Sequence, residues 1–154
     1  MPNTTRPLLL GLSLAGLVGL AGCQAYVLHG KVTCGSISVM SLVEPDDPRL
    51  AEPGVPNVQV AVHRDPGRLA IRLTGRALSD ARGSFAVELD EFGAGWMDEE
   101  WLVIATRRGF ETAQLQLRIP SRTDPRRLLI ILAPGISEVP DLRDDLIEQY
   151  ERFR

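Results

Sequence analysis

Segments in which apolar and polar residues alternate recur along the chain, the pattern of a β-strand with one face in the core and one in water. In the segment 57–62, Val58, Val60 and Val62 alternate with more polar or smaller residues. The same period predicts strands at 69–74, 85–90 and 114–119, with the core-facing residues Leu69, Ile71, Leu73, Phe85, Val87, Leu89, Leu115, Leu117 and Ile119.

Three further segments complete the predicted strands. The continuous apolar runs 101–106 and 128–132 predict strands that are buried on both faces, and 26–33 predicts an opening strand. Gly, Pro and Asp at turn positions separate the segments, with no helical period between them. The pattern therefore predicts an all-β fold of about seven strands, a sandwich or a barrel.

Two predicted loops interrupt the series of alternating segments. The stretch 44–57 holds four prolines and four acidic residues, which predicts a solvated, stiffened loop. The stretch 92–100, FGAGWMDEE, predicts a second loop, rich in glycine and acid.

The period changes in the C-terminal region 136–154, where residues 140–154 predict a short amphipathic α-helix. One helical stripe carries Leu142, Leu146, Tyr150 and Phe153. A helix of about 14 residues is marginal alone in water, so the stripe should pack on the chain's own sandwich or on a partner.

The N-terminus has the pattern of an exported protein. Arg6 precedes an apolar run of 13 residues, 8–20, shorter than the roughly 17–25 residues of a spanning helix and typical of a secretory signal peptide. The run ends in LAGC, residues 20–23, which resembles the lipobox of bacterial lipoproteins. The resemblance implies cleavage after residue 22 and lipid, including palmitate, on Cys23. An ordinary signal peptide followed by a chance cysteine is the alternative.

The same resemblance implies a place in the cell envelope. An Asp after the lipidated cysteine favours the inner membrane in some lipoproteins, so Gln24 favours the outer membrane, at its periplasmic face or its surface. Removing 1–22 leaves about 130 residues, the size of one domain. We expect that domain at 23–135, followed by the helix at 136–154.

The net charge and the cysteine content limit the classes of partner that the protein is expected to bind. The net charge is −3, which argues against non-specific binding of nucleic acid, since such binding needs a basic surface. Once Cys23 is lipidated, Cys34 has no partner within the chain. We interpret Cys34 as a small apolar residue inside a strand, with an intermolecular disulfide as the alternative.

Four motifs appear in a fixed order: HGKV at 29–32, GVPNVQV at 54–60, SDARGSF at 79–85 and RGFE at 108–111. Together they resemble the carboxypeptidase regulatory-like domain, one of the transthyretin-like (prealbumin-like) sandwiches. The resemblance implies seven antiparallel strands in a Greek key, and a mostly non-catalytic adaptor or recognition role. The stretch 34–53 and the C-terminal helix depart from the family pattern.

One of these motifs also has a direct physical interpretation. Gly83 can adopt a positive φ in a tight turn, Asp80 can cap the backbone N–H groups of that turn, and Phe85 then enters the core.

Candidate chemistry is sparse in this sequence. The soft or imidazole metal ligands are His29, Cys34, Met40 and His63, whose order does not match a cupredoxin, so we expect no metal and no cofactor. Neither a G-x-S-x-G motif nor a serine with evident His and Asp partners predicts nucleophilic catalysis. The adjacent acids at 46–47, 99–100 and 144–145 are expected on the solvated surface.

Trp96 is the one aromatic residue with the context of a binding site. In its glycine-rich loop it could stack on a sugar or on a partner side chain, or it could fold back over the sandwich as a clamp. Trp101 begins a predicted strand and is expected in the core.

These patterns together predict a lipid-anchored, non-catalytic module of the cell envelope that presents a β-sandwich to another protein. One alternative is a carbohydrate-binding module that uses Trp96. Another is a structural lipoprotein of a secretion machine, because the outer-membrane lipoprotein of type VI secretion is also a transthyretin-like sandwich.

Overall fold

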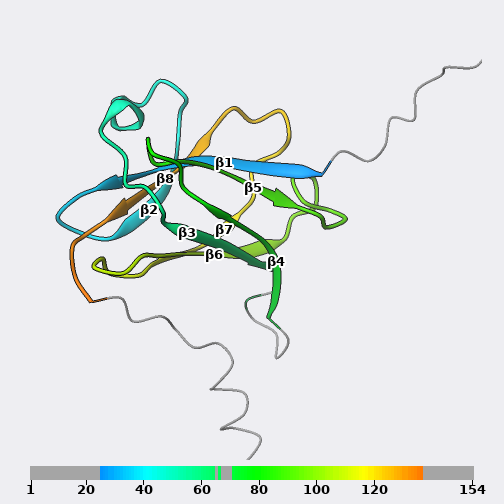
Figure 1. Cartoon of the computed structure of the whole chain (residues 1–154). Helices are drawn as coiled ribbons and strands as arrows, with labels where there is room; N and C mark the ends of the chain where they lie inside the picture. Colours follow the sequence, from blue (N-terminus) through cyan, green and yellow to red (C-terminus); the bar gives the residue numbers. More distant parts are fainter. Residues whose placement is uncertain (1–24, 65, 67–70, 137–154) are drawn as a thin grey trace, which may run out of the picture.

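The part of the chain that the structure describes contains eight β-strands and one 3₁₀ turn (Figure 1). The computed structural model describes residues 25–64, 66 and 71–136. The predicted signal peptide, Cys23, and the stripe residues Leu142, Leu146, Tyr150 and Phe153 lie outside the described residues. The elements are β1 (Tyr26–Cys34), β2 (Val39–Val43), η1 (Pro48–Ala51), β3 (Gln59–Arg64), β4 (Arg72–Leu78), β5 (Ser84–Leu89), β6 (Glu100–Thr106), β7 (Ala113–Arg118) and β8 (Arg127–Leu132).

All seven predicted strands have a counterpart among the described residues, with shifts of a few residues at their ends. The predicted core residue Leu69 lies outside the described residues. The expected count is nevertheless one too low, because β2 forms within the stretch 34–53. This five-residue strand adds to the edge of β8, where Met40 pairs with Ile130. It is too short to show a clear period in the sequence.

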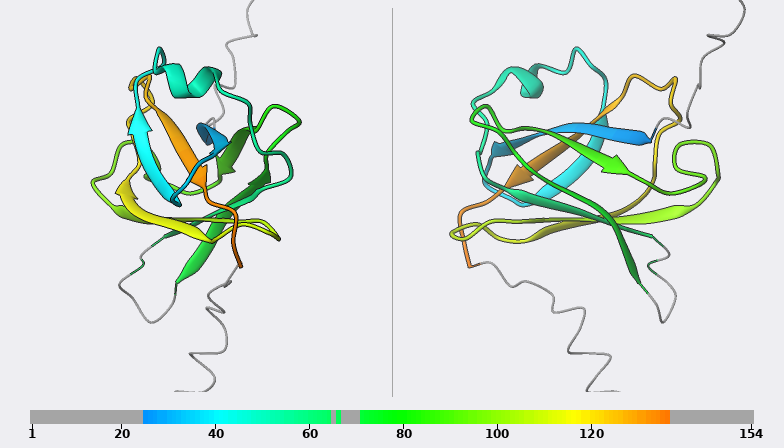
Figure 2. Two further views of the ribbon diagram at one scale, coloured as in Figure 1. Left: turned by 90° about the vertical axis from the view of Figure 1, so that its left-hand side faces the viewer. Right: turned by 45° about the vertical axis from the view of Figure 1, so that its right-hand side comes forward.

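The strands form two four-stranded sheets that pack face to face (Figure 2). The first sheet has the order β2-β8-β1-β5 and the second has the order β4-β3-β6-β7. β1 and β8 pair in parallel, so the expectation of a purely antiparallel sandwich is wrong at this pair. The reason is topological: after β7 the chain crosses to the first sheet and enters it in the direction of β1.

The core lies between the sheets and is built from the predicted inward faces. Val58, Val60 and Val62 are completely buried, as are Val87 and Val103. β6 and β8 are buried on both faces, as their continuous apolar runs predict. Trp101 is 1% exposed and belongs to the core cluster, as expected.

In β4, one residue predicted to face the core lies on the opposite face of the sheet. Its pairing with β3 shifts between Val62 and His63, so that Val62 pairs with Gly75 while His63 pairs with Leu73. The extra residue is Thr74, whose hydroxyl donates to the carbonyl of Val62 at 2.9 Å. Because of the extra residue, Leu73 lies on the opposite face from Gly75 and Ala77 where regular alternation would place it on the same face, and this predicted core residue is exposed.

Two expectations about the N-terminal half need correction. Cys34 ends β1 and is exposed, so it is not a buried apolar residue. The loop 44–57 is largely exposed, yet it also lies against the first sheet: Lys31 Nζ donates to the carbonyl of Leu50 at 2.7 Å, and Val55 is buried.

The predicted turn at Gly83 is confirmed. Gly83 has φ +78°, and the Asp80 carboxylate accepts from the N–H groups of Arg82 at 2.8 Å and Ser84 at 2.9 Å. Phe85 follows at once into the core.

Candidate functional site

The strongest candidate site is the end of the sandwich where β1 begins, on the right in Figure 1. The start of β1, the loop 90–99 and the segment 119–126 meet there. Ala25, Tyr26, Phe92, Trp96 and Arg122 contribute to the lining of a hollow of about 310 Å³. A second hollow, of about 450 Å³, is lined by Tyr26 and Arg122 together with residues of the segment 121–127.

The loop 90–99 has a defined backbone conformation. Gly93 and Gly95 have φ values of +101° and +79°, which residues with side chains rarely adopt. A Cβ on Gly95 would overlap the ring of Tyr26, so the loop backbone lies directly against the start of β1. Ala94 between the two glycines is buried, and the N–H groups of Trp96 and Met97 both donate to the carbonyl of Gly93.

This backbone places apolar side chains in solvent. Phe92 is 78% exposed, Trp96 65% and Met97 39%. The rings of Phe92 and Trp96 meet edge to face, with centroids 5.1 Å apart. Trp96 is therefore not a clamp folded back over the sandwich, and the binding interpretation of this residue retains its structural basis.

Beneath the loop, one arginine joins two carboxylates. Arg64 contacts Glu91 at 3.1 Å and Glu99 at 2.7 Å, and its guanidinium lies 5.8 Å from the ring centroid of Trp101. Arg72 contacts the other oxygen of Glu91 at 2.7 Å. The Arg64, Glu91 and Glu99 side chains are only 22%, 11% and 21% exposed, so the expectation of a solvated acid at position 99 is wrong.

Sequence reasoning missed this ion cluster, although a signal for it exists. Arg64 follows Val58, Val60 and Val62 in the inward-facing phase of β3. Glu91 continues the inward phase of β5 in the same way, and Glu99 precedes Trp101 in the inward phase of β6. In each case a charged residue occupies the next position that the alternation assigns to the core side of the strand. Such a position indicates an ion pair between the sheets, because an isolated buried charge is too costly.

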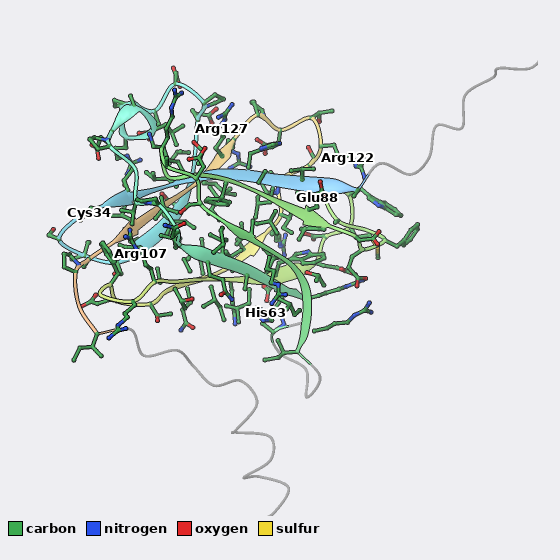
Figure 3. All side chains as sticks on the ribbon, in the orientation of Figure 1. Cys34, His63, Glu88, Arg107, Arg122 and Arg127 are labelled. Carbon is green, nitrogen blue, oxygen red and sulfur yellow. The ribbon has the colours of Figure 1, made fainter. Side chains whose placement is uncertain are left out.

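Tyr26 lines both hollows, and the pKa of its hydroxyl is shifted. Burial, with the nearby Asp124 carboxylate, raises the pKa of Tyr26 to about 12. The phenol is protonated at physiological pH, as that of an unperturbed tyrosine also is. Arg122 lies at the same end of the molecule (Figure 3) and lines both hollows together with Tyr26.

The structure does not bring the candidate metal ligands together. Met40 is buried in the core, Cys34 is exposed at the far end of β1, and His63 lies on the outer face of β3 (Figure 3). Among residues 25–64, 66 and 71–136, no group of three or more His, Cys, Asp or Glu side chains is arranged to hold a metal ion. Within the same residues, no helix is long and apolar enough to span a membrane.

Comparisons of the chain with models of protein families, with curated proteins and with solved structures give no match.

Proposed function

We propose that the protein is a lipid-anchored, non-catalytic module of the cell envelope that presents a transthyretin-like, Greek-key β-sandwich to a protein partner. The observation that carries the proposal is the short distance in sequence between the lipobox cysteine and the fold. β1 begins at Tyr26, three residues after Cys23. A lipid on Cys23 would hold the sandwich directly against the membrane surface. Because Gln24, and not Asp, follows the cysteine, we propose that this membrane is the outer membrane.

The glycines of the four motifs support the resemblance to the carboxypeptidase regulatory-like domain. At Gly30 and Gly54, a Cβ would overlap carbonyl oxygens of neighbouring segments. Gly83 and Gly109 have positive φ values of 78° and 87°. Each motif glycine thus occupies a position where a side chain is sterically or conformationally unfavourable.

The anchor is tested by replacing each cysteine in turn. In cells grown with radiolabelled palmitate, Cys23→Ser should lose the label, because the variant has no sulfur to carry the acyl chains that stable anchoring needs. It should accumulate as the uncleaved precursor or as a soluble exported form. Cys34→Ser is the matched control and should be labelled and membrane-bound like the wild type. Full labelling of the Cys23→Ser protein would show that the lipoprotein proposal is wrong.

The partner surface is tested with Leu146 and Trp96. We expect Leu146→Asp to abolish capture of envelope proteins, since it places a charge in the apolar stripe that also contains Leu142, Tyr150 and Phe153. A carbohydrate-binding module remains a second candidate because Trp96 is exposed. In that case Trp96→Ala alone would abolish retention on glycans, and Leu146→Asp would have no effect on partners.

A role as a structural lipoprotein of a secretion machine is a special case of the main proposal. It predicts that the captured partners are subunits of one envelope assembly. No feature of the described residues favours it over other protein partners.

A further inference from the structure

The aromatic loop lies at the end of the sandwich where β1 begins, and the predicted lipid anchor precedes β1 in the sequence. Ala25 and Tyr26 line the same hollow as Phe92 and Trp96. Cys23 precedes Ala25 by two residues, and two residues span at most about 7 Å. A lipid attached to Cys23 would therefore enter the bilayer close to Phe92 and Trp96.

The exposed apolar side chains of this end match the chemistry of a membrane interface. Tryptophan and phenylalanine bury apolar area at the boundary between headgroups and acyl chains, and the indole N–H can still form a hydrogen bond there. Phe92, Trp96 and Met97 project from a loop whose glycines and buried Ala94 hold its backbone. Little conformational entropy would be lost when such a loop contacts lipid.

Three carboxylates around the loop are paired with arginines, whereas Asp90 and Glu100 are exposed. Glu91 and Glu99 are both paired with Arg64, and Asp98 contacts Arg118 at 2.9 Å. Arg122 also lines the hollow beside Trp96. These contacts offset part of the negative charge around the loop, and a zwitterionic lipid surface has no net charge that would repel the rest.

We propose that Phe92, Trp96 and Met97 form a second membrane contact, which inserts into the lipid interface beside the anchor and fixes the orientation of the sandwich. This inference rests on the proposed lipidation of Cys23. A single flexible attachment would leave the sandwich free to rotate about its tether. The aromatic contact would instead turn the β1-start end towards lipid and the opposite end, which carries Arg107, away from it (Figure 3).

The test is fluorescence quenching in phosphatidylcholine vesicles whose acyl chains carry bromine near the ester end, with unbrominated vesicles for comparison. The lipidated full-length protein is reconstituted in both, and Trp96→Phe defines the contribution of Trp96. Trp101 is 1% exposed, so its emission reports folding and should not be quenched. We expect the Trp96 component to shift to the blue and to be largely lost in brominated vesicles.

A matched control moves the tryptophan to the other end of the sandwich. Leu78 is 64% exposed and, with Arg107, lines a hollow at that end. The Leu78→Trp change in the Trp96→Phe background should give an unquenched signal. Equal quenching at both positions would overturn the proposed orientation.

Flotation of the vesicles separates failure of this inference from failure of the anchor. Protein that floats with the vesicles and shows no quenching of Trp96 overturns the membrane contact alone. Protein that does not float overturns the anchor, and the contact with it. If Trp96 emission instead responds only to added oligosaccharide or to protein concentration, the patch binds sugar or a second copy, and the membrane contact is wrong.

Discussion

Gly83 shows how a single residue couples distant parts of the sandwich. The carbonyl of Gly83 accepts from the N–H of Val32 at 2.8 Å, and the carbonyl of Val32 accepts from the N–H of Val55 at 2.9 Å. A Cβ on Gly83 would overlap the Val32 oxygen and crowd Gly54. The position requires glycine both for its backbone conformation and for the space around it.

We therefore expect Gly83→Ala to lower the free energy of unfolding by about 2–4 kcal/mol, the sum of a left-handed φ and a clash with backbone. Gly109→Ala is the control, because Gly109 also has a positive φ but nothing lies within 4 Å of the added Cβ. It should cost only about 1–2 kcal/mol, the strain of the positive φ alone. Urea denaturation compares the two variants, and equal losses would show that the clash at Gly83 is relieved by relaxation.

His63 is expected to make stability depend on pH. Burial lowers the pKa of its imidazole below 6.5, although a hydrogen bond with the backbone of Leu102 acts in the opposite direction. In the unfolded chain His63 takes up a proton near pH 6.5, whereas in the folded protein it takes one up only at lower pH. The stability from this residue is therefore present above pH 6.5 and is lost as the pH falls from 6.5 through the lower folded-state pKa.

The measurement is urea unfolding at pH 7.5 and pH 5.5, for the wild type and for His63→Gln. The wild type should lose more stability between these two values than the variant, which lacks the titrating group. An equal loss in both proteins would show that burial does not perturb His63 in the way described.

At the scale of elements, the ion cluster joins the ends of three strands. Arg64 at the end of β3 contacts Glu91 after β5 and Glu99 before β6. The cluster thus ties both ends of the loop 90–99 to the second sheet. These contacts hold the loop that carries Phe92 and Trp96. Breaking them should therefore lower the free energy of unfolding and alter the position of Trp96.

Arg64→Met should lower the free energy of unfolding by about 1–3 kcal/mol, because it leaves Glu99 partly buried without its cation. Arg72→Met is the matched control: the Arg72 side chain is 72% exposed, and exposed ion pairs contribute about 0–1 kcal/mol. Thermal or urea unfolding measures both variants. If Arg72→Met costs as much as Arg64→Met, the stabilising partner of Glu91 is Arg72, and the cluster is not organised around Arg64.

At the scale of the whole molecule, the two ends of the sandwich have different character. The end where β1 begins carries the aromatic pair and the ion cluster. The opposite end carries exposed Leu78 and Ile136, with Arg107 and Arg108, around a hollow of about 800 Å³. With the first end held at the membrane, as we propose, this second end would face possible partners.

The sequence by itself determined where most strands lie and which of their residues are buried. Alternation is a local property, because neighbouring side chains on a strand point to opposite faces whatever the strand pairs with. Val58, Val60 and Val62 could therefore be assigned to the core, and the turn at Gly83 could be predicted from residues 79–85. The lipobox at 20–23 is also local, and Cys23 remains a prediction because it lies outside the described residues.

Only the tertiary structure decided how the strands pair. The parallel pairing of Gly30 with Leu128 joins residues far apart in sequence, and no local pattern encodes such a partner. The bulge opposite Val62 and His63 reversed the face of Leu73, since a shift of one residue moves a side chain to the other face. The ion cluster at Arg64 and the exposure of Trp96 likewise depend on which segments meet in space, and therefore on the packing of the two sheets.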